Sequence, residues 1–136
     1  MTTTTRYTTI ARGPARRWEI TGSLDEGYTG YDRGHTLQAV ERAHRTWQER
    51  EGLILGALLT PATVLYGLPW HGAVRAAYER GWILSGVIST LYDADLSDEE
   101  ALTRVLSLAA FLADQLGQQR IYVVCGGVQH ILERAA

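Results

Sequence analysis

Residues 97–125 read SDEEALTRVLSLAAFLADQLGQQRIYVVC, the pattern of a capped amphipathic helix that leads into a strand. Ser97 and Glu100 predict a capping box, in which each side chain bonds to the backbone of the other residue. Apolar residues then recur at helical spacing until Gly117, a residue type that commonly ends helices. The apolar run 121–125 predicts a strand. The glycine pair 126–127 after it predicts a two-residue hairpin turn or a bulge, followed by a further strand.

The first half of the chain has the same order of elements. Residues 17–24 alternate between apolar and polar side chains, which is typical of a half-buried strand. Thr36 is expected to cap a helix that Gly52 ends. Residues 53–59 are apolar at consecutive positions and predict an interior strand. Strand, helix and strand follow one another again over residues 82–132, so the sequence predicts a duplicated β-α-β plan.

The middle of the chain is harder to assign. Thr60 and Pro61 are expected to form a turn, and residues 62–66 a strand after it. Residues 70–80 fit either a loop with a short helix or a further strand. The uncharged run 53–74 is long enough to cross a bilayer. Prolines and glycines interrupt this run, so buried strands explain it better than a membrane span.

Two β-α-β units with both helices on one face predict an α+β, ferredoxin-like two-layer sandwich. The sheet is left open as antiparallel or mixed. A single domain is expected over residues 17–136, after a flexible arm rich in Thr and Arg at residues 1–16. Sheets of this kind pair face to face in the dimeric α+β barrel proteins, a resemblance of architecture that carries no function. The second sheet face is expected to be covered by a second subunit or by the middle segment of the chain, and the resemblance favours a homodimer.

Composition excludes several classes of chemistry. The chain has 136 residues and a formal net charge of −2, so we do not expect nucleic acid or a membrane surface as partner. All 13 basic side chains are Arg, which excludes a Schiff-base lysine and a P-loop lysine. The lack of Lys and Asn predicts a bacterial gene of high GC content. Cys125 is the single cysteine, which excludes an intrachain disulfide and favours the cytoplasm. The polar N-terminus predicts no secretory leader.

The main candidate site is the segment GYTGYDRGH, residues 27–35. It precedes the first predicted helix, whose N-terminal N–H groups favour an anion. Its spacing matches neither the dinucleotide nor the P-loop pattern. We expect substrate binding from Arg33, Tyr28 and Tyr31, and acid–base catalysis from Asp32 and His35.

A second candidate lies on the first predicted helix. His44 falls on the apolar stripe of that helix, so it is expected to point inward and could act as a general base. The alternative is a core histidine that bonds to the backbone. Trp70 and His71 follow Pro69 in a predicted loop, where they could line the mouth of a pocket. Neither a cofactor nor a metal is predicted, because no cluster has complete ligand spacing.

Two functions therefore remain open. The first is a small-molecule-binding protein or cofactor-independent enzyme that acts on an anionic or polar organic ligand. Its pocket would lie between the first helix and the sheet. The alternative is a non-catalytic interaction module or accessory subunit, which would use the sheet face and residues 1–17. The sequence leaves open whether the chain is an enzyme.

Overall fold

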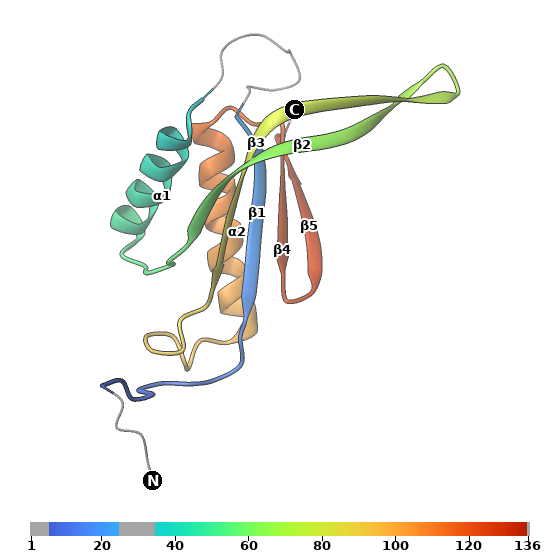
Figure 1. The fold of residues 1–136 in the computed structure, drawn as a ribbon. Helices are drawn as coiled ribbons and strands as arrows, with labels where there is room; N and C mark the ends of the chain where they lie inside the picture. The colour runs from blue at the N-terminus through green and yellow to red at the C-terminus, as the bar shows by residue number, and fades with distance from the viewer. Residues whose placement is uncertain (1–5, 25–34, 136) are drawn as a thin grey trace.

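The computed structural model describes residues 6–24 and 35–135, which form one antiparallel sheet and two helices (Figure 1). The elements in chain order are β1 (Arg17–Ser23), α1 (Leu37–Glu51), β2 (Leu58–Trp70), β3 (Ala73–Val87), α2 (Asp98–Gln115), β4 (Arg120–Cys125) and β5 (Val128–Glu133). Among the described residues, no helix is long and apolar enough to cross a membrane.

The sheet has the strand order β2-β3-β1-β4-β5, and each neighbouring pair is antiparallel. The helices follow β1 and β3, and both pack on the same face. This arrangement is compatible with a ferredoxin-like fold that carries β5 as an extra edge strand. The predicted α+β class is confirmed, and the sheet is antiparallel throughout. The internal duplication stays a prediction.

The core lies between the two helices and one face of the sheet. Trp18 and Ile20 of β1 are buried, while Glu19 between them and Thr21 after them are more exposed, as the alternation predicted. Trp82 of β3 and Trp47 of α1 are also almost fully buried. Burial of these aromatic side chains contributes on the order of 2–3 kcal/mol each. They therefore hold α1 and the centre of the sheet together.

The ends of α2 and the turn after β4 agree with the sequence prediction. The Ser97 hydroxyl accepts a hydrogen bond from the Glu100 N–H at 3.0 Å, and the Glu100 carboxylate accepts one from the Ser97 N–H at 3.4 Å. Gly126 and Gly127 have φ of 61° and 76°, values that suit a tight turn between two paired strands. The alternative of a bulge is therefore excluded here.

The predicted strand at residues 53–59 and the turn after it are wrong. Strand β2 begins at Leu58 and runs straight through Pro61, which pairs with Trp82. Proline has no N–H for a ladder, but an edge strand tolerates it where the N–H would point outward. Leu55 is buried in the loop before β2 rather than in a strand. The apolar run at residues 53–57 therefore belongs to a partly buried loop, which has the same sequence pattern as an interior strand.

Strands β2 and β3 form a hairpin that is much longer than the rest of the sheet (Figure 1). Strand β3 pairs with β1 only as far as Gly81, so in the sheet register residues 63–70 and 73–80 pair with each other. At the base of this segment the Arg80 carbonyl still accepts a hydrogen bond from the Leu24 N–H at 3.0 Å. We call residues 63–80 the hairpin arm. Residues 70–80, left open between loop and strand, are strand except at the turn. In the turn, His71 and Gly72 have φ of 47° and 78°.

Candidate functional site

The largest of the described hollows lies where α2 begins. The start of α2, the turn between β4 and β5 and the start of β1 meet at the lower end of the view in Figure 1. They border an open hollow of ≈ 660 Å³. We call it the α2 hollow; its lining is Ala15, Arg16, Arg17, Ile88, Asp98, Glu99, Ala101, Leu102, Cys125, Gly126, Gly127, Val128 and His130. The volume falls within the range of about 300–1,000 Å³ that is usual for small-molecule sites.

Arg16, one of the charged residues that line the α2 hollow, has a structural role. The Arg16 guanidinium donates to the Leu96 carbonyl at 2.5 Å and to the Asp93 carbonyl at 2.9 Å. It also reaches the Asp98 carboxylate at 3.4 Å. These bonds fix the loop before α2 to the start of β1. Arg16 is the last residue of the predicted N-terminal arm, so the arm is attached to the domain at this point.

A second arginine holds the same loop from the other side. Arg104 of α2 pairs with the Asp93 carboxylate at 3.1 Å, and the two side chains are only 12% and 16% exposed. Such a shielded pair resists being opened, because either charge alone would be left poorly solvated. Arg16 and Arg104 therefore hold the loop before α2 from two sides, and this loop leads into the residues of α2 that line the hollow.

The other charged side chains that line the hollow, those of Arg17, Asp98 and Glu99, are exposed. Arg17 makes neither a hydrogen bond nor an ion pair of its side chain within the described part of the chain. The Asp98 side chain is 94% exposed, and Glu99 is exposed as well. The Arg17 guanidinium and the Glu99 carboxylate thus stand at the rim with their hydrogen-bonding groups available, and the exposed Asp98 carboxylate lies beside them in contact with Arg16. Such a rim can hold a ligand that carries both a negative and a positive group.

The hollow also has apolar lining residues, an imidazole and a thiol. Ile88, Leu102 and Val128 supply apolar surface. The Nε2 atom of His130 is buried and lacks a hydrogen-bond partner among the described residues. Burial raises the pKa of the Cys125 thiol above its ordinary value, and the Asp98 carboxylate raises it further. The thiol is therefore neutral near pH 7 and is no thiolate nucleophile.

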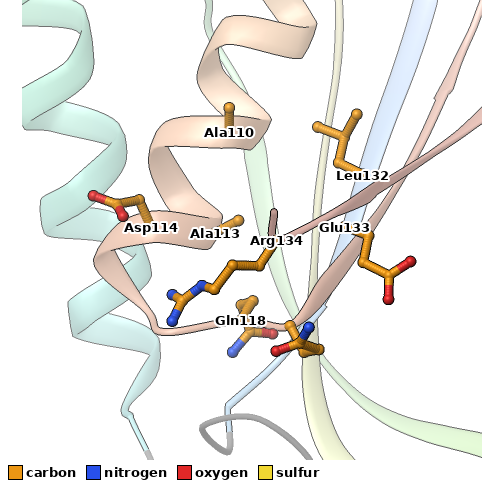
Figure 2. Close-up of a pocket in the computed structure, with 8 residues that line it drawn as sticks. Ala110, Ala113, Asp114, Gln118, Leu132, Glu133 and Arg134 are labelled. Atoms are coloured by element: carbon orange, nitrogen blue, oxygen red, sulfur yellow. The ribbon is translucent and has the colours of Figure 1, made fainter. Parts of the chain in front are cut away.

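A smaller hollow of ≈ 200 Å³ lies at the other end of α2 (Figure 2). Figure 2 shows the Arg134 side chain crossing beneath α2, while Glu133 points away from it. Gln118 is buried at its floor, accepts from the Ser23 N–H at 2.7 Å and donates to the Leu116 carbonyl at 3.2 Å. Its amide therefore joins β1 to the end of α2, a structural role.

The structure describes two of the histidines that the sequence proposed near α1. His44 is half-buried on α1, and its Nε2 lies 2.7 Å from the Leu55 carbonyl. Because a carbonyl only accepts, Nε2 donates, and a base would have to use Nδ1. His35 lies just before α1, where its backbone N–H donates to the Leu24 carbonyl at 2.5 Å. The catalytic roles of both residues stay predictions.

The other predicted site residues are distributed elsewhere. Trp70 and His71 lie at the far end of the hairpin arm, with ring centroids 4.8 Å apart, and α1 lies on the opposite side of the molecule (Figure 1). The structure does not bring them together with His44. Four further residues, Tyr28, Tyr31, Asp32 and Arg33, lie outside the described residues, so their binding and catalytic roles stay predictions.

Sequence reasoning missed the α2 hollow because its residues come from four separate segments. Asp98 and Glu99 were explained by the helix N-terminus, where acidic side chains are common. His130 had no partner that spacing could identify. The start of β1 and the turn after β4 meet only because β1 and β4 are neighbours in the sheet, as the pairing of Trp18 with Cys125 shows.

Comparison with known proteins gives a likeness of fold. No family model matches the chain, and no curated protein matches it. Among solved structures, it is similar to a phage SAM lyase in complex with S-methyl-5'-thioadenosine, with a TM-score of 0.71 and 15% identity over 93% of this chain and 97% of that one. It is also similar to a phage SAM lyase in the apo state, with a TM-score of 0.67 and 16% identity over the same shares. At this identity the likeness establishes the shared α+β fold.

Proposed function

We propose that this chain binds a polar organic ligand in the α2 hollow and acts as a small-molecule-binding protein or a cofactor-independent enzyme. One observation carries the proposal. The hollow combines an open guanidinium, that of Arg17, and the carboxylates of Asp98 and Glu99 with an apolar wall. Few precisely placed polar groups in a largely apolar cavity are the usual composition of a ligand site.

The structural neighbour suggests which ligands to test first. Its complex contains S-methyl-5'-thioadenosine, and the similarity to this chain covers nearly the whole of both. S-adenosylmethionine carries a carboxylate, an ammonium and a sulfonium beside an apolar adenosyl body. In our proposal Arg17 pairs with the carboxylate, while Asp98 and Glu99 face the cationic groups. Leu102 and Val128 contact the nucleoside.

Isothermal calorimetry on the full chain tests this proposal, with S-adenosylmethionine and S-methyl-5'-thioadenosine as separate probes. We expect binding of both, and at least tenfold weaker S-adenosylmethionine binding for Arg17→Gln and Glu99→Gln. Leu102→Trp fills the hollow and should weaken both probes. Arg45→Gln changes an exposed arginine on α1 and serves as the control. If neither probe binds at millimolar concentration, or if the hollow variants bind as tightly as the wild type, the proposal is wrong.

A second measurement separates a binding protein from an enzyme. The chain is incubated with S-adenosylmethionine, and the thioadenosine product is quantified by chromatography. Release of product above the uncatalysed rate, lost in Glu99→Gln or Leu102→Trp, supports an enzyme that uses the hollow. Binding without release supports a binding protein.

The pocket that the sequence placed between α1 and the sheet remains a rival location. Its prediction is that Arg33→Ala and His44→Gln weaken ligand binding while the α2 hollow variants leave it unchanged. The two locations therefore give opposite results in the same calorimetric series. The alternative function, a non-catalytic interaction module, is favoured by a different observation, the exposed apolar surface considered next.

A further inference from the structure

The hairpin arm carries large apolar side chains that the described part of the chain leaves exposed. Leu65, Val74 and Tyr78 share one face of the arm and are each more than 75% exposed, whereas Trp70 and Leu68 share the other face and are 52% and 44% exposed. The arm extends about 25 Å beyond β1 at ~3.4 Å per residue. An isolated two-stranded hairpin is only marginally stable in water, even without exposed apolar groups. The arm therefore needs a surface to pack against.

The sheet face away from the helices also carries exposed apolar residues. Register places Leu58, Ser85, Glu19 and Val124 in one row across four neighbouring strands. The next row contains Thr60, Ile83, Thr21, Tyr122 and Ile131. Leu58 of β2, Val124 of β4 and Ile131 of β5 are exposed. The helix-free face therefore carries apolar side chains on both sides of the central strands β3 and β1.

A hollow of ≈ 340 Å³ lies in the helix-free face. Leu58, Val87 and Val124 form its apolar rim, Glu19 lies within it, and Arg17 lines one side. The Glu19 carboxylate makes no ion pair within the described residues. An apolar group with a cation beside it therefore matches the apolar rim and the Glu19 carboxylate.

The end of the arm presents that combination. The Arg75 guanidinium lies over the Trp70 ring, 5.1 Å from its centroid. Arg75 forms no ion pair among the described residues, and Trp70 is 52% exposed. Arm and face therefore complement each other in charge as well as in apolar surface. Because the same chain carries both, a second copy of the chain supplies the matching partner.

The β2 edge of the sheet argues against one other route to self-association. Pro61 and Pro69 lie in edge strand β2, and neither can donate a hydrogen bond to an added strand. Pairing along this edge is therefore interrupted at two places. A face contact has no such interruption.

We propose that the hairpin arm of one copy packs across the helix-free face of a second copy, with Trp70 in the hollow and Arg75 paired with Glu19. Reciprocal exchange of two arms closes a dimer with two-fold symmetry, whereas a head-to-tail contact closes a ring. The contact differs from a simple face-to-face pairing of sheets, because the arm supplies one of the two surfaces. The contact depends on no ligand, and Arg17 is the one residue that lines both hollows within the described part of the chain.

The first test is the mass of the full chain by light scattering over a concentration series. We expect a dimer or a closed ring for the wild type. Trp70→Glu on the arm and Val124→Glu on the face should each weaken association at least tenfold, with unchanged circular dichroism. Leu91→Glu places the same charge at an exposed apolar residue in the loop after β3 and serves as the control. A monomeric wild type at 100 μM would overturn the proposal and leave the arm for another partner.

Mixing the two variants decides between arm-to-face contact and the alternatives. In a mixture, the intact arm of the Val124→Glu chain meets the intact face of the Trp70→Glu chain. Association should therefore return in part, as a mixed species identified by tags of different mass. Contact between two arms or between two faces predicts no recovery. If the mixture of the two variants does not associate, the arm-to-face arrangement is wrong.

A charge exchange tests the ion pair separately. Arg75→Glu alone should weaken association, and adding Glu19→Arg to the same chain should restore it, because every copy then carries the reversed pair. A second variant replaces residues 66–77 by Asn-Gly, which shortens the arm without touching the strands of the core. We expect this variant to be monomeric and folded. If it associates like the wild type, the arm is not the interface.

Discussion

Gly22 of β1 and Trp82 of β3 face each other across the sheet, and the indole occupies the space that a side chain on residue 22 would fill. A Cβ atom at Gly22 would lie 2.4 Å from Cζ2 of Trp82. The indole is also fixed by a hydrogen bond from its Nε1 to the Ser23 carbonyl at 3.0 Å. The glycine therefore allows a fully buried tryptophan to lie flat on its neighbouring strand.

Gly22→Ala should destabilise the fold, because the fixed Trp82 ring must move. Overpacking of this kind costs about 1–3 kcal/mol. Urea unfolding followed by tryptophan fluorescence gives the free energy of unfolding. Gly56→Ala is the matched control, since a Cβ atom there meets no atom within 4 Å. An equal effect of the two substitutions would contradict this explanation.

Ser97→Ala should destabilise the chain by about 1 kcal/mol, because the Glu100 N–H loses its acceptor at the start of α2. Thr36 provides the control within the same molecule. It occupies the N-cap of α1, yet its side chain makes no capping hydrogen bond. Thr36→Ala should therefore cost clearly less in the same urea titration. The reverse order would show that the α2 cap contributes little.

Arg104→Met should cost roughly 3 kcal/mol, because it leaves the shielded Asp93 carboxylate without its partner. Arg45→Met removes the arginine of a surface pair whose side chains are about 60% exposed. Exposed pairs of this kind contribute only about 0.3–0.5 kcal/mol. Thermal and urea unfolding compare the two variants. Similar losses would mean that the Asp93 loop is not held by its ion pair.

The alkylation rate of Cys125 reports on the α2 hollow. Burial, and then Asp98, raise the pKa of the thiol, so the reactive thiolate should form at higher pH than in a free cysteine. The pH profile of iodoacetamide labelling should accordingly lie to the alkaline side of that for glutathione. Asp98→Asn should shift it part of the way back. A profile equal to that of glutathione would contradict the raised pKa.

The same thiol has a consequence for stability at high pH. A raised pKa in the folded state means that folding favours the neutral thiol. This contribution to stability is fully present below the pKa of the unfolded thiol, and it is lost as pH rises through the folded pKa. Cys125→Ser should flatten the fall in the free energy of unfolding in that alkaline range. An unchanged slope would show that another group is responsible.

Several elements follow from local sequence alone. The alternation of residues 17–24 identifies β1, and Ser97 with Glu100 identifies the start of α2, because strand periodicity and helix capping depend on neighbours within a few residues. Gly52 and the pair Gly126 and Gly127 likewise mark positions where the backbone needs positive φ.

The candidate sites required the tertiary structure. Leu55 shows what local sequence cannot distinguish, because an apolar residue in a buried loop and one in an interior strand have the same local pattern. The α2 hollow joins Arg17 to Glu99 through long-range sheet pairing, which local periodicity does not encode. The length of the hairpin arm depends on where β1 ends, a property of another strand. Local backbone preferences thus determined the elements, and packing between distant segments decided which surfaces they form.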